Sequence, residues 1–290
     1  MPFRQVWPRR RDDGELSGLV DAGLPSGTVT VSVQPLIQQR REVPAFAIAE
    51  GVYRPRTLES VLTSYVIRHR DATVLVDPAL CVDADHRIMP ELPWMLRGAV
   101  RPMASALSTT SALHWAGITP RDIDFALATH LHWDHVSGLL DLPDLPLAVH
   151  SVEHDWITHG RQAPAGGVRS VMRGRRIDRF DLGGPPVLTF EHSHDLFGDG
   201  SVLLVGLPGH TPGSVGVLLR TRTGLVLLAG DAAWHGTQIE RLRQKAPFPG
   251  LLVDANRTEA FHTLHRLHSI KDRVLIIPAH DPGHHAKLAR

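Results

Sequence analysis

Residues 129–135, Thr-His-Leu-His-Trp-Asp-His, place four possible metal ligands within six positions: His130, His132, Asp134 and His135. The apolar run at 125–128 precedes them and predicts a strand. Alternate residues of an extended segment project to the same side, so His130 and His132 can bind one ion as a pair. A helix beginning after them would turn Asp134 and His135 toward a second ion. Imidazole and carboxylate ligands suit zinc, and also iron or manganese.

Three more predicted strands, at 201–207, 225–229 and 274–277, also end in a possible ligand. In chain order these ligands are His210, Asp231 and His280. Because four strands deliver such residues at their carboxyl ends, we expect the side chains to gather along one rim of a sheet. In the expected assignment Asp231 bridges two ions, each with three further ligands. One set is His130, His132 and His210, and the other is Asp134, His135 and His280.

Two adjacent cations of this kind favour hydrolysis. Ions roughly 3.5–4 Å apart can share a hydroxide, because metal-bound water loses its proton near neutral pH. This bridging hydroxide would be the nucleophile, while the open metal positions polarise a carbonyl or phosphoryl oxygen. The expected catalytic residues are Asp231, the bridge, and Asp134, which can orient the hydroxide. No Ser or Cys nucleophile is evident, and the single cysteine, Cys81, is expected to be a small buried residue.

The elements that must position these residues are mostly strands. Runs rich in Val, Leu and Ile, bounded by Gly, Pro and Asp, predict strands at 28–33, 65–68, 73–76, 125–128, 147–150, 187–190, 201–207, 215–220, 225–229 and 274–277. Helices are predicted at 105–115 and 256–269. We expect five histidines near these elements to face solvent rather than bind metal: His262, His265, His268, His284 and His285.

The sequence shows no repeat, low-complexity tract or Ser/Gly linker that would divide it into halves. Residues 83–104 and 155–186 interrupt the strand rhythm with clustered Pro, Gly and Arg. We therefore expect a flexible N-terminal arm at 1–27, followed by a single domain at 28–290 with insertions near 83–104 and 155–186.

Composition narrows the possible partners. The 290 residues carry 31 Lys and Arg against 30 Asp and Glu, a formal charge of +1, which disfavours a dedicated nucleic-acid binder. The apolar runs fall far short of the roughly 20 residues needed to cross a bilayer, and the first residues fit no secretory leader. We expect a cytoplasmic protein with a small-molecule substrate and no nucleic-acid or membrane partner. The oligomeric state stays open.

These motifs together resemble those of the metallo-β-lactamase fold superfamily. The matching segments are THLHWDH (129–135), PGHTPGS (208–214), AGDA (229–232) and PAHD (278–281). The resemblance implies an α/β (α+β) fold, a four-layer αββα sandwich with the metals at one edge between two sheets. It implies the same seven metal ligands that the spacing suggests. It also implies structural roles for the surrounding Gly138, Gly209 and Gly213.

Within the superfamily, the chain is similar to the compact lactonases that open acyl-homoserine lactones, and to related esterases and organophosphate hydrolases. Such lactonases commonly carry a Tyr three residues after the bridging Asp, where this chain has Trp234. An indole cannot transfer a proton in the pH range of catalysis. Trp234 is therefore expected either to pack against an acyl chain or to be a rim aromatic without a substrate role. The neighbouring His235 is either a substitute acid or a bystander.

Three functions are consistent with these residues. The first is a dinuclear metal-dependent hydrolase of small esters or lactones, with two divalent ions, Zn²⁺ ahead of Fe or Mn. The second is a phosphoester hydrolase, acting on organophosphates or phosphodiesters at the same metals. The third is a non-catalytic metal-binding scaffold, which seven intact ligands disfavour.

Overall fold

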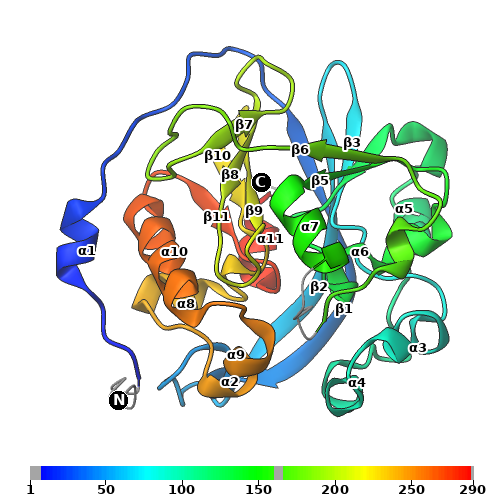
Figure 1. The fold of residues 1–290 in the computed structure, drawn as a ribbon, viewed down its shortest axis with the longest axis horizontal. Coiled ribbons are helices and arrows are strands. Elements are labelled where there is room, and N and C mark those ends of the chain that lie inside the picture. The colour runs from blue at the N-terminus through cyan, green and yellow to red at the C-terminus, as the bar shows by residue number, and fades with distance from the viewer. Residues whose placement is uncertain (1–7, 160–165, 289–290) are drawn as a thin grey trace.

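The computed structural model describes residues 8–159 and 166–288, and its core is a pair of stacked sheets (Figure 1). The first sheet has six strands in the order β1-β2-β3-β4-β5-β6, and the second has five in the order β11-β10-β9-β8-β7. The strands of the first sheet are β1 (Ser32–Pro44), β2 (Thr57–Arg68), β3 (Thr73–Val76), β4 (Phe125–Leu127), β5 (Leu147–His150) and β6 (Ile177–Phe180). Those of the second are β7 (Ser193–Asp195), β8 (Val202–Gly206), β9 (Val215–Thr221), β10 (Gly224–Leu228) and β11 (Leu275–Ile277).

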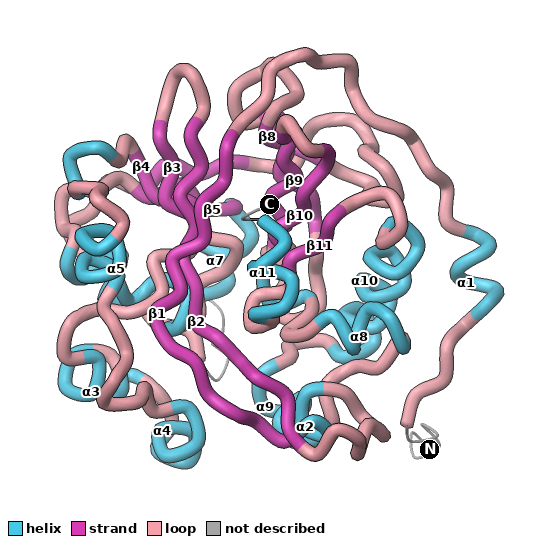
Figure 2. The backbone as a smooth tube through the Cα atoms, turned by 180° about the vertical axis from the view of Figure 1, so that it is seen from behind, coloured by secondary structure: helices cyan, strands magenta, loops and turns pink. Residues whose placement is uncertain are grey.

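Helices surround the sheets on their outer sides (Figures 1 and 2). The α-helices are α1 (Asp13–Gly18), α2 (Ala45–Ile48), α3 (Ala84–Arg87), α4 (Trp94–Val100), α5 (Thr109–Trp115), α6 (Trp133–Val136), α7 (Ser151–His159), α8 (Gly236–Arg241), α9 (Pro247–Val253), α10 (Arg257–Ile270) and α11 (Pro282–Leu288). The 3₁₀ turns are η1 (Met89–Glu91), η2 (Pro120–Asp122), η3 (Ser137–Asp141), η4 (Ser170–Met172) and η5 (Gly230–Ala232). In the described part of the chain, every helix is too short or too polar to cross a membrane.

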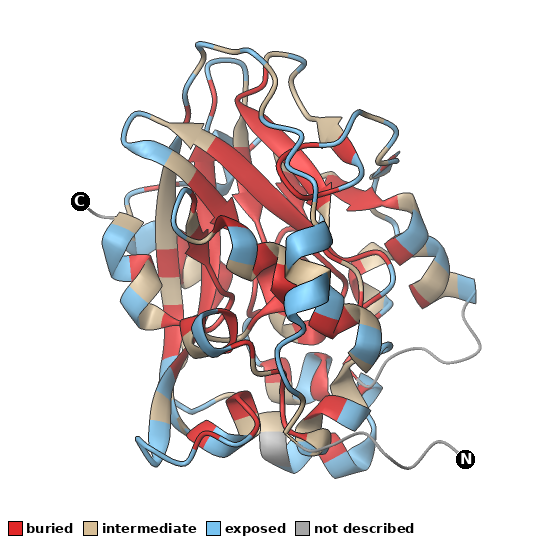
Figure 3. Cartoon of the chain, turned by 90° about the vertical axis from the view of Figure 1, so that its left-hand side faces the viewer, coloured by how far each residue is buried: buried red, intermediate tan, exposed pale blue. Residues whose placement is uncertain are grey.

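Alternation along the strands divides the apolar side chains between an inner core and two outer cores. In β3, Val74 belongs to the cluster between the sheets, whereas Leu75 packs with the helices outside the first sheet. In β8, Leu204 faces the inner cluster and Leu203 packs outward with residues of α8 and α10. Buried residues accordingly fill the strands, and exposed residues line the outer helix surfaces (Figure 3). The predicted αββα sandwich is confirmed, since the layers run helix, sheet, sheet, helix.

The long hairpin of β1 and β2 differs most from the predicted strands (Figure 2). The sequence predicts strands at 28–33 and 65–68, but β1 continues to Pro44 and β2 begins at Thr57. The sequence does not predict the extension because many of its buried positions are polar. Gln38, for example, is buried, and its amide donates to Ser64 Oγ at 2.6 Å and accepts from Leu80 N at 3.0 Å. Hydrogen bonds thus replace the apolar pattern that predicts a strand.

The other strands occur within one or two residues of their predicted bounds, with one exception. The strand predicted at 187–190 is wrong, because this segment forms only an isolated bridge between Val187 and Phe190. The short edge strands β6 and β7 were not predicted, since their sequences, IDRF and SHD, are mostly polar. Edge strands need fewer apolar residues because one side is open to solvent.

The predicted helix at 256–269 corresponds to α10, where Asn256 Oδ1 caps the backbone N–H groups of Thr258 and Glu259. The expectation that its histidines face solvent is wrong for His265, which is fully buried. The segment before α1 covers His265, whose Nε2 accepts from Asp12 N at 3.1 Å.

The helix at 105–115 begins later than predicted, at Thr109, because Ser108 caps it. His285 is also buried, contrary to expectation, and its Nε2 lies 2.5 Å from the Tyr65 hydroxyl. The burial of histidines such as this one depends on which elements cover them, which periodicity does not reveal.

The expected arm at 1–27 lies partly outside the described residues, which begin at residue 8. Within the described part, Arg9 and Glu15 contact α10, where Glu15 pairs with His262 at 2.5 Å. The expected insertion at 83–104 forms α3, η1 and α4, and that at 155–186 includes η4 and β6, apart from residues 160–165, which are not described. The division of the chain at residue 27 stays a prediction.

Gly209 gives a test of the loop that precedes His210. Its φ is +124°, and a Cβ added there would lie 2.1 Å from Ala260 N. We expect Gly209→Ala to lower the free energy of unfolding of the metal-free protein by at least ~2 kcal/mol, because both strain and a backbone clash result. Urea unfolding measures this loss. Gly183→Ala is the matched control, since nothing lies within 4 Å of its added Cβ, and an equal loss there would contradict the interpretation.

Candidate metal centre

The ligand-bearing loops all leave the carboxyl ends of strands. His130 and His132 follow β4, and the chain turns into α6 immediately after His132. This turn brings Asp134 and His135 into a second group with His280, as the spacing predicts. The remaining three candidates follow β8, β10 and β11; in order they are His210, Asp231 and His280.

Four of the candidates form one compact and fully buried group: His130, His132, His210 and Asp231. One donor atom from each of these residues lies within 4.8 Å of the others. The closest approach joins His210 Nε2 to His132 Nδ1, at 2.9 Å. His210 Nε2 also lies 3.1 Å from Asp231 Oδ2.

A second group lies beside the first and consists of Asp134, His135 and His280. The other carboxylate oxygen of Asp231 faces this group. Asp231 Oδ1 lies 3.1 Å from His135 Nε2 and 3.2 Å from His280 Nε2. The structure therefore brings all seven sequence candidates together, with one oxygen of Asp231 turned toward each group.

The outward nitrogens of several rings are held by other groups. Asp77 Oδ2 lies 2.8 Å from His135 Nδ1, and Asp254 Oδ1 lies 2.9 Å from His210 Nδ1. The backbone oxygen of Val61 lies 2.8 Å from His280 Nδ1. Such contacts set the tautomer and direct the Nε2 lone pair toward the centre.

Sequence reasoning missed these outer carboxylates. Asp77 had a usable signal, because it follows the predicted strand at 73–76 just as the ligands follow theirs. Asp254 lies between α9 and α10 and had no such signal.

Burial and charge decide the protonation of the group. Burial, with the neighbouring histidines, lowers the pKa of His130 and of His132 well below the usual value. Burial also acts on His135, but the carboxylates of Asp231 and Asp77 outweigh it and raise its pKa well above the usual value. The pKa of Asp231 lies well below its usual value despite burial, because His280, His135 and His210 face the carboxylate.

These residues fit a pair of cations. His130 Nε2 is buried and has no hydrogen-bond partner, and the facing nitrogens of His132 and His210 offer further lone pairs. Neutral imidazoles and ionised carboxylates are the forms that bind metal, so an ion in the second group would displace the proton that the raised pKa favours on His135. A cation in each group would coordinate donor atoms that otherwise mostly face one another, and Asp231 could serve both.

Lys245 is a buried cation behind the first group. Its Nζ donates to Asp254 Oδ1 at 2.8 Å and to the backbone oxygen of Asp231 at 3.0 Å. It also lies 4.8 Å from the centre of the Trp234 ring. Although burial opposes ionisation, Lys245 and His210 lower the pKa of Asp254 to about 2. Lys245 thus connects the carboxylate that contacts His210 with the backbone of Asp231.

Glu153 joins the loop that carries His130 and His132 to the loop that carries His210. This fully buried side chain accepts from Leu131 N at 2.9 Å and from Gly213 N at 3.2 Å. A Cβ added at Gly213 would lie 2.2 Å from the Glu153 backbone nitrogen, which explains the glycine. Sequence reasoning missed Glu153, because one acidic residue in a helix has no distinctive pattern.

Trp234 contacts the centre directly. Its indole Nε1 donates to Asp231 Oδ2 at 2.6 Å, and the residue also lines the cavity over the ligands. The neighbouring His235 instead caps α8, where its Nδ1 accepts from Thr237 N at 3.1 Å. His235 is absent from the described lining of that cavity.

The cavity over the ligands has a volume of about 360 Å³ and is mostly apolar. We call it the metal cavity; its floor includes His132, Asp134, His210, Asp231 and His280. Its walls come from β1, β2, α2, α4 and α9. In both Figure 1 and Figure 2, α2 and α9 lie side by side near the far end of the β1–β2 hairpin.

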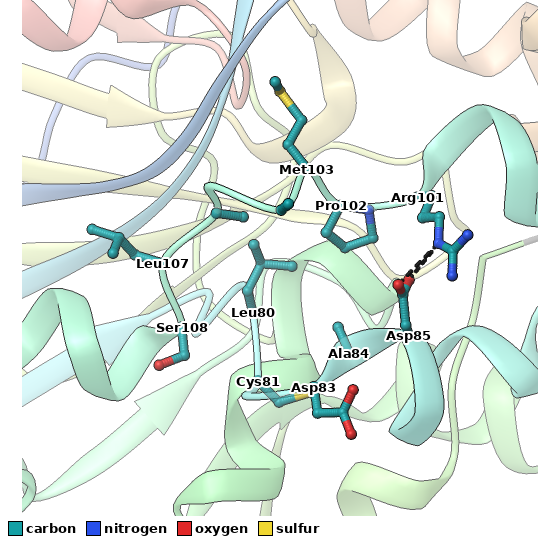
Figure 4. Close-up of a pocket in the computed structure, with 12 residues that line it drawn as sticks. Leu80, Cys81, Asp83, Ala84, Asp85, Arg101, Pro102, Met103, Leu107 and Ser108 are labelled. Carbon is teal, nitrogen blue, oxygen red and sulfur yellow. Dashed lines mark hydrogen bonds and ion pairs between the residues drawn. The ribbon is translucent and has the colours of Figure 1, made fainter.

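A separate cavity of about 540 Å³ lies between α3 and the segment 101–108 (Figure 4). It shares no lining residue with the metal cavity. The ion pair of Arg101 with Asp85, at 2.9 Å, lies at one side. Cys81 also lines it; this thiol is buried as expected, and burial raises its pKa.

Comparison with curated proteins gives two kinds of relative. N-acyl homoserine lactonase AttM of Azorhizobium caulinodans is 26% identical over 179 residues, which cover 57% of this chain and 61% of that protein. The chain therefore matches less than two thirds of the lactonase. A probable metallo-hydrolase of Mycobacterium tuberculosis is 30% identical over 237 residues, covering 73% of this chain and 72% of that protein. These names bear out the enzyme class expected from the sequence.

Solved structures share the fold. One is an N-acyl homoserine lactone hydrolase with the product N-hexanoyl-L-homoserine at its catalytic metal centre, with a TM-score of 0.64 and 16% identity. The match covers 90% of this chain and 97% of the chain of that hydrolase. Another is AidC, a dizinc quorum-quenching lactonase, with a TM-score of 0.59, 15% identity and coverage of 90% and 91%.

The family profile of the metallo-beta-lactamase superfamily matches residues 60–280. This range includes every ligand loop and most of both sheets. The chain belongs to the metallo-beta-lactamase superfamily.

Proposed function

We propose that this chain is a dinuclear metal-dependent hydrolase of small ester or lactone substrates. The observation that carries the proposal is the position of Asp231, whose two oxygens face two separate groups of ligands beneath an apolar cavity. The lactonase and metallo-hydrolase names of its relatives support the same class.

Zinc is the ion that we propose for both groups, since a dizinc lactonase shares the fold. His130, His132 and His210 would hold one ion, and Asp134, His135 and His280 the other, with Asp231 shared. Such a pair supplies activated water and polarises the substrate carbonyl.

The protein's own groups fix the remaining steps. Asp134 lines the metal cavity, so we assign it, with Asp231, to orientation of the attacking water. The apolar walls exclude water from the rest of the cavity and suit an acyl chain better than a phosphodiester.

Substrate profiling of the metal-loaded protein tests the reaction class. The panel is N-decanoyl homoserine lactone, 4-nitrophenyl decanoate and bis(4-nitrophenyl) phosphate. We expect the two acyl substrates to have kcat/KM values at least ~100-fold above the phosphodiester, with activity lost on chelation and restored by zinc. The opposite order would favour the phosphoesterase alternative, and no turnover with full metal occupancy would favour the scaffold.

The bridge makes a prediction about metal content. Asp231→Ala should lower occupancy in both groups and reduce turnover by at least ~100-fold, since one carboxylate serves both ions. Elemental analysis of protein purified without chelator measures the occupancy. His262→Ala is the control because this side chain is exposed on α10 and pairs with Glu15. Metal loss in the control, with full occupancy in Asp231→Ala, would refute the assignment.

Two variants separate the roles of Trp234. Trp234→Phe keeps an aromatic ring but removes the N–H that binds Asp231 Oδ2, so we expect the metal dissociation constant to rise ~10–100-fold. Competition with a chromogenic chelator measures it. Trp234→Ala should in addition raise KM more for decanoyl substrates than for butanoyl substrates, because the apolar contact with the longer acyl chain is lost. If the Phe variant binds metal as tightly as the wild type, the indole hydrogen bond has no role in the site.

A further inference from the structure

Arg41 lies on the wall of the metal cavity, at a position fixed by the β1–β2 register. It pairs with Ser60 across the two strands. The next residue of β2, Val61, contacts His280 with both of its backbone groups. The Val61 N–H donates to the backbone oxygen of His280, and the Val61 backbone oxygen lies 2.8 Å from His280 Nδ1. Arg41 is therefore one strand away from the segment that fixes a metal ligand.

The side chain points into the cavity rather than to solvent. Partners in an antiparallel pair project to the same face, and alternate residues share it. Gln39, Arg41 and Val43 of β1, with Ser60 and Leu62 of β2, accordingly all line the metal cavity. Arg40 projects to the opposite face, where it pairs with Glu59 at 2.9 Å, and both of these side chains are exposed.

The charge of Arg41 stands out in this cavity. Among the described lining residues, it is the sole Lys or Arg. It is half-buried, and Asp134 lines the same cavity. A guanidinium in the wall of this cavity adds positive charge to the space over the candidate ligands, which favours an anion there.

The outer part of the cavity has the opposite character. Phe46 of α2, Met95 of α4 and Phe248 of α9 line it and remain exposed at its mouth. Leu62 and Leu96 line it more deeply and are buried. The cavity thus offers a cation in its wall and an apolar surface that leads outward.

We propose that Arg41 binds a carboxylate of the substrate next to the scissile bond, and that the natural substrates are amphiphilic acids whose acyl chain follows the apolar wall. This inference rests on the proposed hydrolysis of esters or lactones and names a substrate class within it. A planar guanidinium can donate two parallel hydrogen bonds to a carboxylate. The carboxylate that ester hydrolysis itself produces has the same chemistry, so the test must separate the two sources.

A matched pair of chromogenic esters does so. 4-Nitrophenyl decanoate is neutral, and 5-decanoyloxy-2-nitrobenzoate carries a carboxylate on the same leaving group. Both release decanoate, so only the substrate charge differs. In the metal-loaded protein, Arg41→Met should raise KM for the anionic ester roughly 10- to 100-fold, because a charge-assisted hydrogen bond is lost. KM for the neutral ester should change less than about threefold.

Two further variants control for structure. Arg41→Lys retains the charge without the paired donors and should recover part of the preference for the anionic ester. Arg40→Met removes the adjacent, outward arginine and should leave the ratio of the two KM values unchanged. Metal content of each variant is measured alongside.

Three results would overturn the proposal. Equal losses for both esters, or loss of metal, would mean that Arg41 acts by positioning Asp134. A weaker inhibition constant for decanoate, with an unchanged KM ratio, would mean that Arg41 binds only the product. An unchanged KM ratio and unchanged inhibition would mean that it binds neither.

A binding measurement keeps this inference separate from the proposed reaction. Calorimetric titration compares the same two leaving groups without turnover. Wild type and Arg41→Met are each titrated with 5-hydroxy-2-nitrobenzoate, which carries the carboxylate, and with 4-nitrophenol, which lacks it. We expect a preference for the anion that Arg41→Met removes. If wild type hydrolyses neither ester yet shows this preference, the proposed reaction fails while the anion site stands; equal binding by wild type and variant refutes the anion site.

Discussion

The buried carboxylate of Asp231 is the group on which the rest of the site depends. Its oxygens lie 3.1–3.2 Å from ring nitrogens of His135, His210 and His280, which come from three separate loops. An ionised carboxylate that is buried away from water is strongly destabilised unless positive or hydrogen-bonding groups surround it. No single segment can surround it from several sides, so the ligands must converge from several strand ends. The two stacked sheets satisfy this requirement because their strands end at one edge.

The same constraint explains the groups behind the ligands. Imidazoles that face a shared centre must present lone pairs in fixed directions, and Asp77 and Asp254 fix two of those rings from outside. Each added carboxylate increases the negative charge of a buried region. Lys245 offsets that of Asp254 at 2.8 Å and at the same time holds the backbone of Asp231. The buried lysine is therefore part of the charge balance of the centre rather than an isolated polar residue.

The sequence predicted the candidate metal-binding residues better than it predicted the residues that form the cavity walls around them. The positions of all seven candidate ligands followed from residue type and strand ends, since a metal site requires donors at short spacing on defined faces. Gln38 in β1 and His265 in α10 were misjudged because tertiary hydrogen bonds, not local pattern, decide their burial. Arg41 had no signal at all, since it becomes a cavity residue only through the register of β1 with β2. Local patterns thus predict the candidate metal centre and the enzyme class, whereas long-range pairing decides which residues line the cavity above that centre.

Trp234 belongs both to the surroundings of Asp231 and to the lining of the metal cavity. In the lactonases that the sequence resembles, a phenol at this position can assist the substrate. Here the indole N–H is already engaged by Asp231 Oδ2 at 2.6 Å, while Lys245 lies over the ring. A donor held by the bridging carboxylate is not available to a leaving group, and an indole has no proton to transfer near neutral pH. The exchange of phenol for indole therefore moves this position from the reacting bond to the support of Asp231. In the proposed hydrolysis, water or another group in the metal cavity must then supply the proton to the leaving group.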